Sequence, residues 1–377
     1  MCIISLIHRN SMSWNDLKVP LFATWKAWWL ARHPAEVGEY SWSYLFERGK
    51  QIRPRLFCEL WRYLCPDREP PVEVAFMVEC VHVASLILDD LPWMDNAIER
   101  RGLTTLHRMF SVRKALLLVH DVLELAWEVG HSNPLSREMC IGGVAQSQWD
   151  EWIRSKANAL WRGQFLDLSR EGSLEELALL KTGTLFECVT ELVAIGTGLD
   201  PIFWKGWGQA LGILFQWVDD WNDRDEDNAI QQRNAFNESS DATKERYSIL
   251  WANVIHGIGQ EWWKQPFGAF LYEYFTSIGI TGEIGPITSL ISLPTLFSTV
   301  APVSTPIVYS STGSLPVAIM FMNLVRPYLY HSLPMKCDIS ILWTIPEKDW
   351  IHILEKTEGI QPFLPFIQQC ERMILLG

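Results

Sequence analysis

The sequence lacks the cysteine patterns that mark a zinc ribbon or a domain stapled by disulfides. Its eight cysteines include no CxxC pair and no Cys/His group at zinc spacing. It also lacks an excess of positive charge, because 32 Lys and Arg stand against 44 Asp and Glu, a net charge of −12. Nucleic-acid binding depends on Lys and Arg that neutralise phosphates. We therefore expect a reduced, cytoplasmic protein with no nucleic-acid partner.

Long uninterrupted apolar segments are also missing. Residues 284–325 carry no charge, but five prolines interrupt every window long enough to cross a bilayer, which argues against a transmembrane helix. The start, MCIISLIHRN, has neither the basic leader nor the small-residue cleavage site of a secretory signal. We expect no transmembrane span. For 284–325 the open alternatives are a buried cap, an interfacial loop in contact with a membrane surface, and a poorly ordered extension.

Most of the chain carries a helical pattern. From about residue 15 to 258, apolar residues recur at threes and fours, with no βαβ rhythm and no internal repeat. This pattern predicts an all-α fold, a single large antiparallel helical bundle formed by residues 1–258. Residues 259–377 are expected to form an atypical C-terminal extension, rich in proline, apolar and partly helical. We interpret the 20 tryptophans as core packing.

Two acidic clusters each close an apolar helical run. The first lies inside HVASLILDDLPWMDNAIERRG at 82–102, and the second ends the run at 203–223. Residues four apart share a helix face, so the outer aspartates of the second cluster can hold one ion between them. In the first cluster, Pro92 predicts a helix end that loops and brings the last aspartate back. The clusters are Asp89, Asp90 and Asp95, and Asp219, Asp220 and Asp223.

These carboxylates need a positive partner. At the mouth of an apolar bundle they would repel one another unless a cation lay between them. Mg²⁺ fits, because it takes oxygen ligands and is usually held by one or two carboxylates together with substrate phosphates. Arg100 and Arg101 follow at once and suit multidentate contacts with phosphate oxygens. The combination predicts a diphosphate ligand, bridged to acid through Mg²⁺ and held directly by the arginines.

Three further motifs accompany the acidic clusters, namely GKQIRPRL at 49–56, RGQFLDL at 162–168 and KTGTLF at 181–186. In this order, over roughly residues 41–250, the five motifs resemble those of the trans-type isoprenyl diphosphate synthases, the farnesyl and geranylgeranyl diphosphate synthase family. The resemblance implies an isoprenoid synthase-like bundle around a central apolar cavity, and a prenyltransferase with three Mg²⁺ ions that condenses an allylic diphosphate with isopentenyl diphosphate. It also implies a geranylgeranyl or farnesyl diphosphate product and a homodimer.

The resemblance assigns roles residue by residue. The implied metal ligands are Asp89, Asp90, Asp95, Asp219, Asp220 and Asp223. All of these except Asp223 are also expected to be catalytic, together with Lys181. The residues implied to bind the allylic substrate are Arg100, Lys181, Thr182 and Gln216. Those implied to bind isopentenyl diphosphate are Lys50, Arg53, His82 and Arg101. Arg233 and Lys244 stand near the positions of two family lysines and are expected to bind substrate.

Two further features bear on product and pattern. Ala84 and Ser85 lie one helical turn before Asp89, where family side chains form the floor of the product pocket. Small residues leave room there, which favours a twenty-carbon over a fifteen-carbon product. HDVL at 120–123 departs from the GD-x-L sequence usual in the family.

Two other functions stay open at this stage. A class I terpene synthase on the same scaffold would ionise and cyclise a prenyl diphosphate without isopentenyl diphosphate, and need not keep Lys50, Arg53, His82 and Arg101. A non-catalytic regulatory subunit of a prenyl synthase heteromer commonly loses one or both acidic motifs. Because both the basic group and the acidic motifs are present, condensation is the favoured prediction.

Overall fold

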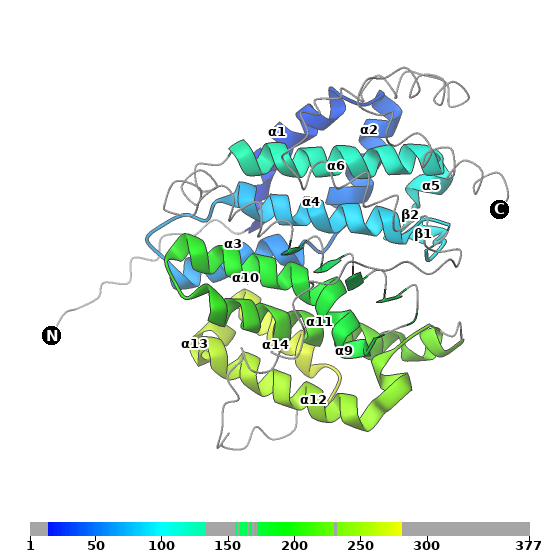
Figure 1. Ribbon diagram of the computed structural model, residues 1–377. Coiled ribbons are helices and arrows are strands. Elements are labelled where there is room, and N and C mark those ends of the chain that lie inside the picture. Colours follow the sequence, from blue (N-terminus) through cyan, green and yellow to red (C-terminus); the bar gives the residue numbers. More distant parts are fainter. Residues whose placement is uncertain are drawn as a thin grey trace.

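Helices account for nearly all regular structure in the computed structural model of the protein (Figure 1). The structure describes residues 14–280, with the exception of 93, 133–154, 157, 158, 161, 164, 165, 168, 169, 171, 230 and 231. Within this part of the chain the strands are β1 (Glu99–Arg100) and β2 (Leu103–Thr104), which pair antiparallel. The all-α prediction is confirmed.

The N-terminal helices pack through buried tryptophans. Trp29 donates a hydrogen bond from its indole to Ser41 Oγ (3.0 Å), and Trp14 donates to Gln51 Oε1 (2.9 Å). Fully buried tryptophans confirm the core-packing interpretation where the chain is described: Trp14, Trp29, Trp42, Trp61, Trp207, Trp251 and Trp262. The N-terminal helical elements are α1 (Trp14–Leu30), α2 (Ala35–Trp42), the π-helical turn η1 (Ser43–Glu47) and α3 (Ile52–Leu64).

The first acidic cluster lies where α4 ends. Helix α4 (Val72–Asp89) begins after Pro71, packs on α6 (Val112–Ser132) and α3, and ends at the β1–β2 hairpin and the short α5 (Leu106–Met109). The amide of Asp95 donates to the carbonyl of Asp89 (2.9 Å). The predicted return of the chain after Pro92 is therefore confirmed.

The second acidic cluster lies on α11, which crosses its neighbours closely. A Cβ on Gly212 would lie 2.5 Å from the Cα of Gly183, so the two backbones can approach this closely only because residue 212 is glycine. This contact places the π-helical turn beside the acidic part of α11. The elements are α9 (Leu174–Ala178), η2 (Leu179–Gly183), α10 (Thr184–Thr197), α11 (Pro201–Ala229) and α12 (Ala235–Ile258).

The chain remains helical beyond residue 258. Helices α13 (Gln260–Trp263) and α14 (Pro266–Thr276) pack against α12, α11 and α3. Pro266 occupies the first position of α14, where its missing N–H costs nothing. The division of the chain at 258 stays a prediction, and the expectations for 281–377 lie outside the described residues.

Successive packing pairs give the order of the bundle. Helix α4 lies between α6 and α3, and α10 lies between α3 and α11, which in turn contacts α12 and α14 (Figure 1). The apolar cavity expected inside this bundle stays a prediction. Among the described helices, none combines the length and the hydropathy that a membrane crossing requires.

Candidate active site

Asp89 and Asp95 lie together at the end of α4. Reduced hydration beside the hairpin, together with the charge of Asp89, raises the pKa of Asp95 to about 6, although Asp95 keeps an exposed edge. Lys181, on η2, opposes this rise. Two like charges next to a single lysine favour the uptake of a further cation.

Asp90 has a different environment from its neighbour. Its carboxylate is buried and accepts a hydrogen bond from Arg100 Nε at Oδ1 (2.7 Å) and one from the Tyr44 hydroxyl at Oδ2. Burial raises the pKa of Asp90, while Arg100 and Tyr44 stabilise its charged form. Asp90 thus joins α4 to the hairpin and to η1, and Arg100 takes its orientation from this contact.

The aspartates of the second cluster also differ from one another in their hydrogen bonds and exposure. Asp220 accepts from Gln216 Nε2 at Oδ1 (2.9 Å) and from the Ala235 amide at Oδ2 (3.1 Å), and burial raises its pKa to about 6. Asp219 accepts from the hydroxyl of Tyr274 at Oδ1 (2.7 Å). Asp223 follows four residues later on α11 and is exposed. Asp219 and Asp223 therefore lie in one continuous helix, as predicted.

Lys181 and Thr182 connect η2 to both clusters. The Lys181 ammonium pairs with Asp167, and although burial lowers its pKa, the charges of Asp89, Asp167 and Asp95 outweigh that and raise it. The Thr182 hydroxyl donates to Gln216 Oε1 (2.7 Å), the amide that also binds Asp220. The turn thus places the Lys181 ammonium near the first cluster. It also begins a hydrogen-bond chain, through Thr182 and Gln216, that reaches Asp220 in the second.

The predicted basic group also assembles. Burial lowers the pKa of Arg53 to about 10, and Arg53 interacts electrostatically with Arg101 and with Asp219. Burial and the charges of Arg53 and Arg101 lower the pKa of His82 well below its usual range. A Cβ on Gly49 would lie 2.7 Å from Arg101 Nη1, so this glycine lets the guanidinium reach the chain beside Lys50. Lys50 in turn stabilises the charged form of Asp219.

The motifs did not single out three residues of this region. Glu79 lies one turn before His82, is 2% exposed, and stabilises the charged forms of Arg53 and Arg101. Its Oε2 atom has no hydrogen-bond partner among the described residues. The sequence could have indicated Glu79, because it is a carboxylate in an otherwise apolar helical run. No sequence pattern could have indicated Tyr44 or Tyr274, because their partners are remote in sequence.

Arg233 and Lys244 have contacts away from the carboxylate clusters. Arg233 donates to Glu238 (3.0 Å) and to the carbonyl of Gly172 (3.1 Å). Lys244 lies 3.9 Å from Asp241 and faces the ring of Trp221. Their expected contact with substrate stays a prediction.

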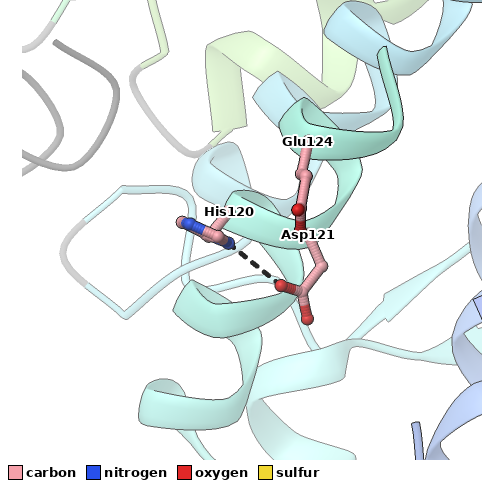
Figure 2. Close-up of side chains that lie close together, drawn as sticks. All are labelled: His120, Asp121 and Glu124. Atoms are coloured by element: carbon pink, nitrogen blue, oxygen red, sulfur yellow. Dashed lines mark hydrogen bonds and ion pairs between the residues drawn. The ribbon is translucent and has the colours of Figure 1, made fainter. Parts of the chain in front are cut away.

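The HDVL segment belongs to a separate cluster on α6, formed by His120, Asp121 and Glu124 (Figure 2). Asp121 accepts from His120 Nδ1 (3.0 Å) and from His33 Nε2 (2.9 Å). Burial raises the pKa of Asp121, but these two hydrogen bonds outweigh burial and lower it to about 2. The cluster thus ties the turn between α1 and α2 to α6, and the histidines account for the charge of Asp121 without a metal.

Oxygen ligands at both clusters suit Mg²⁺. Asp90 and Asp220 have both carboxylate oxygens in hydrogen bonds to the protein, whereas Asp219 uses one oxygen in this way and Asp95 and Asp223 are exposed. Mg²⁺ needs only one or two carboxylates when phosphates and waters complete its octahedron. The donor set therefore fits ions that bridge these carboxylates to a diphosphate.

The chain is similar in sequence to known proteins over about half of its length. The chain is 33% identical over 222 residues to geranylgeranyl pyrophosphate synthase 3, chloroplastic, of Arabidopsis thaliana, covering 54% of this chain and 57% of that protein. It is 31% identical over 185 residues to a geranylgeranyl diphosphate synthase of Rhodobacter capsulatus, covering 48% and 62%. In these alignments the chain spans less than two thirds of the length of either relative.

A solved structure shares the fold. The crystal structure of a FPP/GFPP synthase from Zymomonas mobilis, in its apo form, superimposes with a TM-score of 0.51 at 23% identity, covering 71% of this chain and 98% of that chain. The family model described as polyprenyl synthetase matches residues 36–261, more than half of the sequence. The chain therefore belongs to the polyprenyl synthetase family.

Proposed function

We propose that this protein is a Mg²⁺-dependent trans-prenyltransferase that condenses an allylic diphosphate with isopentenyl diphosphate. The observation that carries the proposal is that the turn η2 is linked to both acidic clusters. Its Thr182 donates a hydrogen bond to Gln216, which binds Asp220, while the neighbouring Lys181 pairs with Asp167 and interacts with Asp89 and Asp95. Two acidic clusters and a separate basic group on one bundle suit two diphosphates of different roles. The names of the related proteins support the same reaction class.

The acidic side of the site would ionise the allylic substrate. Asp89, Asp90, Asp95, Asp219, Asp220 and Asp223 would hold the ions, three in number, and Mg²⁺ bound there stabilises negative charge on a departing diphosphate. Lys181 Nζ, held by Asp167, would bind oxygens of the same diphosphate. The apolar helices beyond the clusters would exclude water from the carbocation that remains.

The basic side would orient the second substrate. Arg53 and Arg101 bring two positive charges close together beside the single carboxylate of Glu79, and a bound diphosphate would add the negative charge needed to balance them. His82, held neutral at its lowered pKa, can offer a hydrogen bond without adding charge. The isopentenyl double bond would then attack the cation, and the proton lost would pass to the released diphosphate. No side-chain nucleophile is needed.

The terpene synthase reading is less well supported. Its chemistry needs no isopentenyl diphosphate site, whereas Lys50, Arg53, His82 and Arg101, the residues expected to form that site, are all present. A purely regulatory subunit would not need the full set of six aspartates. A homodimer, a membrane-surface contact of the C-terminal region and a cytoplasmic location remain predictions.

Product analysis tests the reaction directly. The full-length chain would be incubated with Mg²⁺ and isopentenyl diphosphate, together with dimethylallyl, geranyl or farnesyl diphosphate, and the products identified by mass spectrometry. We expect elongated prenyl diphosphates, chiefly of twenty carbons, that vanish when isopentenyl diphosphate is omitted. Cyclic hydrocarbons formed without isopentenyl diphosphate would contradict the proposal, and activity only after mixing with another synthase would identify a subunit.

A further inference from the structure

Tyr274 lies against the acidic part of α11 although it comes from a distant helix. Its hydroxyl donates to Asp219 Oδ1 (2.7 Å), and its ring stacks on Phe215 with centroids 4.9 Å apart and planes 27° from parallel. Phe215 and Asp219 are four residues apart on α11 and so share one face of the helix. Tyr274 therefore contacts both the ring of Phe215 and the carboxylate of Asp219.

Contacts other than the Tyr274 hydroxyl also hold α14 in place. The next residue, Phe275, is fully buried, and its backbone carbonyl accepts a hydrogen bond from the hydroxyl of Tyr247 on α12 (2.8 Å). The ring of Phe275 also packs on Trp251 with centroids 5.5 Å apart. Helix α14 is thus anchored by neighbours of Tyr274, and the phenol of Tyr274 is free to serve the carboxylate.

A neutral donor on one oxygen changes what Asp219 can do. The hydrogen bond fixes the carboxylate rotamer and occupies Oδ1, but it leaves the negative charge in place, whereas a lysine or arginine would cancel it. The second oxygen is then held in one direction for a cation. Hydrogen bonds of this kind orient ligands at metal sites and commonly govern metal affinity.

We propose that Tyr274 is a positioning residue, which aims the Asp219 carboxylate at a divalent cation bound with a diphosphate. This inference rests on the proposed function for the identity of that site. Tyr274 lies outside residues 36–261, the part of the chain that matches the family model. Helix α14 would therefore support the metal site through Tyr274 as well as extending the bundle.

The test compares Tyr274→Phe with the wild-type full-length chain. Mn²⁺ binding in the presence of inorganic pyrophosphate would be followed by electron paramagnetic resonance, and the Mg²⁺ concentration at half-maximal turnover would be measured in parallel. Loss of a hydrogen bond that orients a ligand weakens metal affinity by about 10- to 100-fold. We expect a shift of about tenfold or more in both measurements, with the ring contact to Phe215 retained.

Tyr247→Phe provides the matched control. It removes a tyrosine hydrogen bond of similar length that runs from α12 to α14, but one that ends on the Phe275 carbonyl and not on a carboxylate. We expect it to lower the melting temperature and to leave Mn²⁺ affinity unchanged. Unchanged Mn²⁺ affinity in Tyr274→Phe, or an equal loss in both variants, would overturn the inference.

The two proposals can fail separately. If wild type makes no elongated product yet Tyr274→Phe weakens Mn²⁺ and pyrophosphate binding, the positioning role stands and the reaction is wrong. If wild type elongates prenyl chains and Tyr274→Phe binds Mn²⁺ normally, the reaction stands and the positioning role is wrong.

Discussion

At the scale of single residues, the six aspartates have two kinds of environment. The sequence presents each cluster as a row of equivalent carboxylates. In the structure, Asp90 and Asp220 use both oxygens for hydrogen bonds within the protein, and Asp219 uses one. The partners that make this difference, such as Tyr44 and Ala235, are distant in sequence, so spacing alone could not reveal it.

Removing a carboxylate expected to hold metal should abolish most activity. We expect Asp89→Ala or Asp219→Ala to lower turnover by about two orders of magnitude or more, because each removes charge that stabilises the leaving group through its ion. Steady-state kinetics at saturating Mg²⁺ would measure the change. Asp225→Ala is the control, since Asp225 is an exposed acid on the same helix. A rate near that of wild type in either active-site variant would contradict the assigned role.

Asp90 should matter first for stability. Asp90→Asn removes the charge that pairs with Arg100 and leaves one acceptor oxygen where Arg100 and Tyr44 now use two, and breaking a buried charged pair costs on the order of 3 kcal/mol of unfolding free energy. Urea unfolding in the presence of EDTA would measure this loss without any contribution from metal. Asp67→Asn, at an exposed position, should change stability by less than about 0.5 kcal/mol. Equal stability of the two variants would argue against the anchoring role.

At the scale of helices, the ends of α4 and α11 were predictable. Each apolar run ends in acid, and Pro92 indicated the return of Asp95, which the hydrogen bond to Asp89 confirms. The π-helical turns η1 and η2 were not foreseen, because a single extra residue per turn leaves no clear mark on periodicity. Yet η2 is what places Lys181 beside Asp89 and Asp95.

The structure distinguishes the two residues of α4, Ala84 and Ser85, that are expected to form the floor of the product pocket. Ala84 is 1% exposed within the core, whereas Ser85 is half-buried and, four residues before Asp89, shares its face. We expect Ser85→Phe to shift products toward shorter chains more strongly than Ala84→Phe. The latter should mainly overpack the core, at a cost of about 1–3 kcal/mol. Chromatography of the product diphosphates would decide, and equal distributions from Ser85→Phe and wild type would exclude Ser85.

The contact between α6 and the turn after α1 should depend on pH. The pKa of Asp121 is lowered to about 2, so its carboxylate contributes stability that is present above its ordinary value near 3.9 and is lost as pH falls toward 2. We expect about 2 kcal/mol of unfolding free energy to disappear over that window. Asp121→Asn should lack this component. Parallel urea titrations from pH 5 to pH 2.5 would measure the difference, and parallel curves for the two proteins would refute it.

At the scale of the whole molecule, the bundle follows the family but its last described helices extend it. The match to the family ends at residue 261, while the described helices continue to Thr276. The sequence predicted an atypical, partly helical region after 258, but not the positions of the short helices α13 and α14. Trp263 of α13 and Phe275 of α14 pack against Trp251 of α12. A local sequence pattern does not reveal contacts of this kind.

The arrangement of the two clusters around one anion is the central claim. A crystal structure of the full-length chain soaked with Mn²⁺ and inorganic pyrophosphate, with an anomalous difference map at the manganese edge, would test it most directly. We predict manganese peaks that touch Asp89 or Asp95 on one side and Asp219 or Asp223 on the other, joined by one pyrophosphate that Lys181 also contacts. Peaks confined to one cluster, or located at His120 and Asp121, would contradict the account.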